Sequence, residues 1–271
     1  MAQYPMRERR YERLRPAQIR AEMDVCPLIY FPLGPLEWHG PHLPLGTDPA
    51  VAYEVALRLC QRTGGLVLPP FFWGTERERT PQTLRDLGFK GDEWIFGMDF
   101  PANSLRSLYV REEFFALLVR EMLDRLVEQG WKVIAIVNGH GADNQRAVLD
   151  RLSAEFSARG PARVVNLFAW ASASSAESTG HADGEETAEL MAIWPETVDL
   201  STLPPADQPL YNVDWAVVDG PTFGGQPAPD HTVRDDPRTS ATRERGERAL
   251  QESIEWLAAQ MRAIVRDTLA G

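Results

Sequence analysis

The stretch Lys132–Asn144 (KVIAIVNGHGADN) decides the fold class. Its first half, Lys132–Val137, is almost wholly apolar and β-branched, which predicts a buried strand. The strand runs straight into the polar turn Asn138-Gly139-His140, and a helix is expected from about Asn144 to Ala158. A buried strand followed directly by a helix is the repeating unit of parallel α/β sheets.

The same alternation extends along the chain in both directions. Apolar runs predict strands at 27–33, 66–72 and 163–170. A further helix is predicted to open with Asp48 as N-cap and Pro49 as first residue, and to stop at Gly64-Gly65. Other helices are expected at 112–129 (with Phe115, Leu118, Met122 and Val127 on its apolar side), 185–194 and 242–269. The pattern predicts an α/β fold: one three-layer α/β/α domain over residues 1–271 with a mostly parallel sheet.

Two segments lack a clear period. Residues 73–110 mix glycine, proline, aspartate and aromatic residues, which is typical of a functional loop or lid. Residues 195–240 are rich in proline, glycine and aspartate, so we expect them to be ordered mainly by packing against the rest of the chain.

Composition excludes several classes of function. The 271 residues carry 28 Lys and Arg against 39 Asp and Glu, and the net charge of −11 disfavours binding to nucleic acid. No run approaches the roughly 20 apolar residues of a membrane span. The arginine-rich start of the chain lacks a secretory signal, and Cys26 and Cys60 are expected to be free buried thiols. We therefore expect a cytoplasmic protein with a small-molecule substrate.

Four of the five histidines fall in three short segments that also carry carboxylates, and only His231 lies elsewhere. In an extended segment Glu37 and His39 can project to the same side, and a tight turn can return Asp48 towards them. His140 ends a different strand, and Glu186 starts a later helix. Mixed nitrogen and oxygen donors of this kind fit one or two divalent ions per subunit, Zn first and Mn or Fe as alternatives.

Each segment also has a plain structural interpretation. Asp48 can be only a helix cap, and Glu185 and Glu186 can simply offset a helix dipole. His42 fits an orienting hydrogen bond better than metal ligation. Asn138-Gly139 can form only a turn. Together, however, the three segments favour a metal-dependent hydrolase that acts through a metal-activated water.

Three motifs carry a resemblance to a known family. PLGPLEWHGPHLPLGTD (32–48), KVIAIVNGHGADN (132–144) and HADGEETAEL (181–190) resemble, in the same order, the motifs of the creatininase (creatinine amidohydrolase) family, over roughly residues 20–260. The resemblance implies a single α/β domain, often a homohexamer, with a two-metal site that hydrolyses amide bonds, commonly in small cyclic compounds.

The resemblance also implies roles for individual residues. Glu37, His39, Asp48 and His140 match metal ligands, with Asp48 bridging two ions. Creatininase takes a further ligand two residues after the strand-end histidine, where this chain has Ala142; Glu186 is the expected replacement and Asp143 a weaker one. His181 matches a histidine suited to protonating the leaving nitrogen, so the expected catalytic residues are His181 and Glu186.

The substrate is less constrained. Trp38 replaces the family's usual glutamine, and Trp38, His42, Asn138 and Gly141 are the expected substrate-binding residues. Relative to the family's pattern, residues 81–99 are an expected insertion that either remodels the pocket or reaches a neighbouring subunit, so creatinine is the less favoured substrate. The alternatives are C–C bond hydrolysis of a cyclic diketone derived from a cyclitol, and a metal-stabilised binding protein without turnover. A Gly-x-Ser-x-Gly nucleophile motif is absent.

Overall fold

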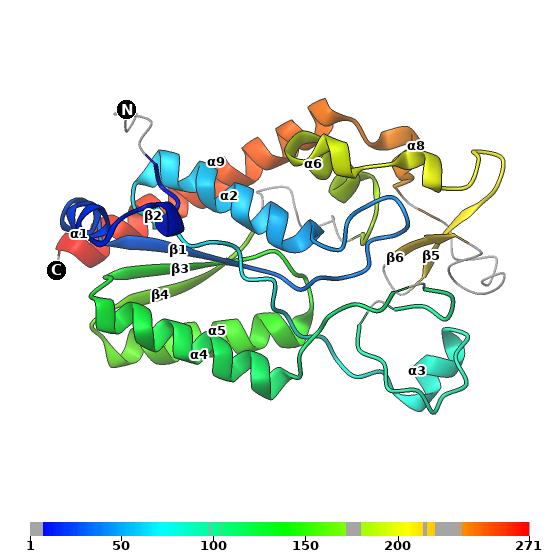
Figure 1. Ribbon diagram of the computed structural model, residues 1–271, viewed down its shortest axis with the longest axis horizontal. Coiled ribbons are helices and arrows are strands. Elements are labelled where there is room, and N and C mark those ends of the chain that lie inside the picture. The colour runs from blue at the N-terminus through cyan, green and yellow to red at the C-terminus, as the bar shows by residue number, and fades with distance from the viewer. Residues whose placement is uncertain are drawn as a thin grey trace.

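A computed structural model of the chain describes residues 8–97, 99–103, 105–171, 180–213, 216–219, 233 and 235–270. It confirms the predicted three-layer α/β/α arrangement around a parallel sheet (Figure 1). The sheet has the strand order β2-β1-β3-β4. Its strands are β1 (Leu28–Leu33), β2 (Leu66–Val67), β3 (Val133–Asn138) and β4 (Arg163–Phe168).

The central strands are buried on both faces, which is why their sequences are continuous apolar runs. Tyr30 and Ala135 face a core shared with α2 (Thr47–Thr63), α6 (Gly184–Ile193) and α9 (Arg243–Ala270). Phe31 and Ile136 face the opposite core, which includes side chains of α1 (Pro16–Val25), α4 (Glu112–Gln129) and α5 (Asp143–Arg159). Figure 1 shows these helices on the two sides of the sheet.

The strand register brings the carboxyl ends of three strands level. Leu33 pairs with Asn138, and Asn138 pairs with Phe168. The segments that leave these ends therefore emerge side by side at one edge of the sheet, where ligands bind in open α/β folds.

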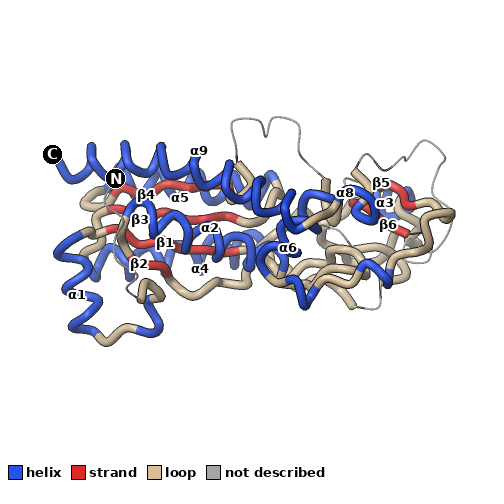
Figure 2. Tube along the Cα trace, turned by 90° about the horizontal axis from the view of Figure 1, so that it is seen from above, coloured by secondary structure: helices blue, strands red, loops and turns tan. Residues whose placement is uncertain are grey.

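Smaller elements lie beyond this edge. Figures 1 and 2 show α3 (Pro81–Asp86), α8 (Pro237–Ser240) and the antiparallel hairpin of β5 (Leu210–Val213) and β6 (Ala216–Asp219) gathered there. Trp38 packs with side chains of this region, namely Leu84, Leu87, Phe89, Ile95 and Phe100. Single turns of 3₁₀ helix are formed by Tyr11–Arg13, Pro195–Thr197 and Leu200–Thr202.

The structure corrects four local predictions. Helix α2 begins at Thr47 with Gly46 as N-cap, so Asp48 lies inside the first turn and does not cap it. Strand β2 has two residues only, because the chain after Val67 leaves the sheet. The buried face of α4 is Phe115, Val119, Leu123 and Leu126; the predicted Leu118, Met122 and Val127 are only partly buried. The hairpin of β5 and β6 was not predicted.

Two further findings concern composition. Cys26 and Cys60 are buried and free, as predicted. Within the described part of the chain, the helices all fall short of the length and apolarity that crossing a bilayer requires.

Candidate metal centre

Three separate parts of the chain meet at the carboxyl edge of the sheet. Glu37 and His39 lie on the loop after β1, and His140 directly follows β3. Glu186 lies in the first turn of α6. Asp48 lies in the first turn of α2, and the other three segments converge on its carboxylate.

Two glycines allow the main chain at Asp48 to approach the ends of the strands. A Cβ atom at Gly34 would lie 2.7 Å from the Cβ of Asp48. A Cβ atom at Gly139 would lie 2.8 Å from the carbonyl carbon of Asp48 and closer still to its oxygen. The start of α2 therefore fits between β1 and β3 only because both positions lack a side chain.

The side chains form two donor groups that share Asp48. In the first, Nδ1 of His140 lies 3.0 Å from Oε2 of Glu37 and 3.0 Å from Oδ2 of Asp48. In the second, Nε2 of His39 lies 3.1 Å from Oδ1 of Asp48 and 3.7 Å from Oε2 of Glu186. Within each group the donor atoms lie within 4.8 Å of one another. Asp48 thus offers one oxygen to each group.

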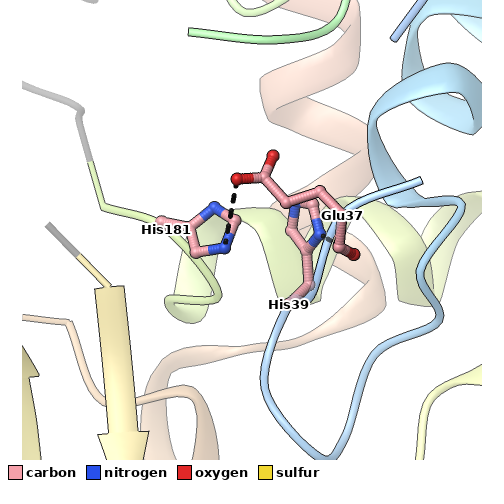
Figure 3. Close-up of side chains that lie close together, drawn as sticks. All are labelled: Glu37, His39 and His181. Carbon is pink, nitrogen blue, oxygen red and sulfur yellow. Dashed lines mark hydrogen bonds and ion pairs between the residues drawn. The ribbon is translucent and has the colours of Figure 1, made fainter. Parts of the chain in front are cut away.

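A third group of donors, Glu37, His39 and His181, adjoins these two (Figure 3). Oε1 of Glu37 points towards the ring of His181, at 3.9 Å from its Nε2. The rings of His39 and His181 lie 4.2 Å apart between centroids. The predicted catalytic histidine is therefore adjacent to the predicted metal ligands.

Hydrogen bonds fix the orientation of these donors. Nδ1 of His39 lies 3.0 Å from the carbonyl oxygen of Glu37, which directs Nε2 of His39 towards Asp48. Oε2 of Glu186 accepts a hydrogen bond of 2.6 Å from the main-chain nitrogen of Ala182, a residue with φ of 57°. The hydroxyl of Tyr109 donates to Oε1 of Glu37.

A second hydrogen-bond network holds the turn after β3. Oδ1 of Asn138 accepts hydrogen bonds from the main-chain nitrogen of His140 (3.1 Å) and from Nε2 of Gln145 (2.8 Å). Oε1 of Gln145 accepts from the nitrogen of Thr75 (2.8 Å), next to Glu76. Oε2 of Glu76 faces Nε2 of His140 at 4.0 Å. The network links His140 to residues 75–76.

The buried charges perturb one another. Burial opposes ionisation of Glu37, but the charge of His140 holds the pKa of that carboxyl well below its usual range. Burial also opposes protonation of His39, yet the carboxylates of Glu186 and Asp48 raise its pKa to about 10. For Glu186 burial dominates and raises the pKa to about 8. The site therefore concentrates negative charge that needs nearby positive charge.

The two remaining histidines behave as neutral groups. Burial, together with the nearby charge of His39, lowers the pKa of His181 to about 4, and Nε2 of His181 lies 2.5 Å from the carbonyl oxygen of Trp38. Burial likewise lowers the pKa of His42 to about 3. Nε2 of His42 lies 2.9 Å from the hydroxyl of Thr187, which joins the loop after β1 to α6.

A cavity of about 350 Å³ opens onto the donor groups. Its wall includes the predicted residues Glu37, Asp48, His140, Gly141, His181 and Glu186. The predicted substrate residues Trp38, His42 and Asn138 are buried outside this wall, and their contact with substrate stays a prediction. Asp143 lines the cavity but pairs with Arg77 at 3.0 Å and belongs to none of the donor groups. His231 lies outside the described residues.

Sequence reasoning missed several residues of the site. Glu76 and Tyr109 lie in the segment 73–110, where no periodicity or motif singled them out. Arg77 and Arg146 also line the cavity. Nothing in the spacing of these residues relates them to the three histidine segments; only the fold does.

The chain is similar in sequence to known proteins. The sequence model of the creatininase family (creatinine amidohydrolase) matches residues 12–261. A mycofactocin precursor peptide peptidase of Mycobacterium ulcerans is 31% identical over 183 residues, 64% of this chain and 60% of that protein. A 3-dehydro-scyllo-inosose hydrolase of Thermotoga maritima is 26% identical over 193 residues, 66% of this chain and 54% of that protein. The matches thus cover less than two thirds of each relative's length.

Solved structures show the same fold. A mutant creatininase of the Zn–Zn type and a creatininase with Mn are each 22% identical, with TM-scores of 0.66 and 0.67. Each comparison covers 96% of this chain and 99% of the other. This chain shares the α/β/α fold of these structures and carries a cluster of histidine and carboxylate donors at the carboxyl edge of its sheet. The chain belongs to the creatininase family.

Proposed function

We propose that this chain is a metal-dependent amidohydrolase that cleaves a C–N amide bond of a small molecule, with a cyclic amide as the favoured substrate. Its ligands to one or two divalent ions, with Zn favoured over Mn or Fe, would be Glu37, His39, Asp48, His140 and Glu186. The observation that carries the proposal is that Asp48 offers one oxygen to each of two donor groups.

The donor set fits such ions on three counts. It combines imidazole nitrogens with carboxylate oxygens, the mixture that Zn and Mn accept. Four of its five members are buried, with Glu37 and Asp48 exposed by 1% and 2%, and Glu186 is partly buried. Oε2 of Glu37 is buried and accepts no hydrogen bond, although it faces Nδ1 of His140 at 3.0 Å, so a cation between these two donors would satisfy it.

When bound, the metal supplies a Lewis acid for a carbonyl oxygen and an activated water. The protein's own groups then manage position and protons. A neutral His181 can accept a proton on its unprotonated ring nitrogen and then deliver a proton to the leaving nitrogen. Tyr109 and the carbonyl oxygen of Glu37 hold two of the donors in place. Ordinary cyclic amides fit within the cavity.

Metal content per chain tests this proposal. We expect about two ions in the wild type, as in binuclear hydrolases, fewer in Asp48→Asn, and about one in Glu186→Gln. Asp143→Asn is the matched control, because Asp143 lines the same cavity outside the donor groups. Unchanged metal content and turnover in a double alanine variant of Asp48 and His140 would refute the proposal.

A second candidate is hydrolysis of a C–C bond in a cyclic diketone derived from a cyclitol. The similarity to the 3-dehydro-scyllo-inosose hydrolase favours it. A screen of cyclic amides, short peptides and cyclic diketones against the zinc-loaded and manganese-loaded protein separates the two reactions. A metal-stabilised binding protein would instead bind metal tightly and turn over none of these compounds.

We also propose that the chain forms a homo-oligomer, a hexamer if it follows the family resemblance. Supporting this, large hydrophobic side chains are exposed along residues 72–117, namely Phe72, Trp94, Leu105, Leu108, Phe114 and Leu117. Sedimentation velocity of the wild type and of a Phe114→Ser, Leu117→Ser double variant tests it: the variant should sediment as a smaller species.

A further inference from the structure

Arg146 presents its guanidinium to the same cavity as the donor groups. It lies in the first turn of α5, and its guanidinium carbon stands 5.2 Å from the centre of the Phe168 ring, at the end of β4. Both residues line the cavity, together with Asp48, His140 and Glu186. Stacking on an aromatic ring holds the guanidinium plane while its N–H edge stays available.

The cavity wall carries many more acidic than basic side chains. The wall carries seven carboxylates: Glu37, Asp48, Glu76, Asp143, Asp183, Glu185 and Glu186. Arg77, the other arginine of the wall, pairs with Asp143 at 3.0 Å. In contrast, among the described residues the guanidinium of Arg146 has no hydrogen bond or ion pair, and only the main-chain nitrogen of Arg146 is bonded, to the carbonyl oxygen of Ala142. A fixed cation without a partner, in a wall otherwise rich in acids, is suited to an anion brought by a ligand.

We infer that Arg146 binds a carboxylate of the substrate, so that the substrate class is a small amide carrying a free carboxylate, such as an acylamino acid or a peptide end. This inference rests on the proposed function, because it requires the amide carbonyl to lie at the donor groups. The acidic side chains of the wall repel an anion at other positions in the cavity. Arg146 therefore determines which end of the substrate lies away from these side chains. Arg146 is thus a specificity residue.

Binding of matched hydroxamates to the zinc-loaded protein tests the inference. The hydroxamate group chelates zinc, and the probes are the monohydroxamates of succinic and glutaric acid, each compared with its uncharged carboxamide analogue. Isothermal titration calorimetry measures all four with the wild type, Arg146→Gln, Arg146→Lys and the control Arg151→Gln. Arg151 is an exposed arginine of the same helix that does not line the cavity.

We expect the wild type and Arg151→Gln to bind one of the carboxylates roughly 10- to 150-fold more tightly than its carboxamide, the range for a hydrogen bond to a charged group. In Arg146→Gln the preference should fall to about one, chiefly because carboxylate affinity falls, and binding of the carboxamide shows that the variant is folded. Arg146→Lys should be intermediate, because it keeps the charge but not the planar fork.

Two results overturn the inference in distinguishable ways. If the wild type binds carboxylates and carboxamides equally, or if Arg146→Gln keeps the preference, Arg146 is not the anion site and the metal centre stands. If no hydroxamate binds the zinc-loaded wild type, the proposed metal centre fails and this inference fails with it.

Discussion

Replacing Gly139 by alanine tests whether the close approach of α2 to β3 creates the metal centre. The new Cβ would lie 2.8 Å from the carbonyl carbon of Asp48 and 3.2 Å from the Cβ of Ala52. Non-bonded carbon atoms prefer about 3.5 Å or more, so the contact with the carbonyl carbon alone requires the turn and the start of α2 to separate by roughly 0.7 Å. The 2.2 Å contact with the carbonyl oxygen of Asp48 requires a larger separation. Both contacts belong to α2, whose main chain cannot rotate away as a side chain would.

This displacement has two expected effects. Ligand distances in metal sites fall within about 0.2 Å of their ideal values, so moving Asp48 against His140 by several times that distance should lower metal affinity at least about tenfold. Forcing an extra methyl group into a packed interior should also lower the free energy of unfolding by about 1–3 kcal/mol.

The assay compares Gly139→Ala with Gly141→Ala. A Cβ at Gly141 would meet only the ring of Phe168, at an ordinary 3.9 Å, so this variant controls for adding a methyl group to the same turn. Zinc affinity is measured by competition with a chelator, and the free energy of unfolding by urea titration of the metal-free proteins. Wild-type values of both in Gly139→Ala would refute the reasoning.

Three further predictions follow from buried carboxyl groups. Burial and the adjacent acids raise the pKa of Glu189 well above 4.5. Glu189 therefore makes its full contribution to the free energy of unfolding below about pH 4.5, and this contribution is lost as the pH rises towards the folded-state pKa. In urea titrations Glu189→Gln should therefore become progressively more stable than wild type above that pH, by up to about 1.4 kcal/mol per pH unit, while Glu252→Gln on the surface of α9 should not. Glu76→Gln should lower zinc affinity about 10-fold in a chelator competition, because it removes the carboxylate facing Nε2 of His140. Tyr109→Phe removes a hydrogen bond to a ligand carboxylate and should weaken zinc binding by a similar factor without changing the number of ions bound; loss of an ion would contradict this.

The sequence was informative where local pattern and tertiary structure agree. Continuous apolar runs identified β1 and β3, because a strand buried on both faces needs apolar residues throughout. The convergence of Asp48 and His140 could be expected because parallel strands end at a common edge. The bounds of α4 were predicted correctly as 112–129.

The rest depended on packing that local pattern does not encode. The face that α4 buries is set by its contact with the sheet and α5, and several alternative stripes along that helix are apolar. The β5–β6 hairpin lies in a segment of proline, glycine and aspartate with no alternation. Glu76 and Arg146 line the cavity, and Tyr109 contacts Glu37. These residues come from the loop after β2 and the start of α5, so only the assembled fold relates them to the histidines.

The segments that meet at Asp48 lie far apart along the polypeptide. Asp48 and His140 are 92 residues apart in sequence, and Glu186 lies further along still. An ion held among them acts as a reversible cross-link that closes long loops and is absent from the unfolded chain, where the donors are scattered. At a free-ion concentration about 100 times the dissociation constant, this linkage adds about 2.7 kcal/mol to the folded state. Metal supply would thereby set the lifetime of the folded protein in addition to its chemistry.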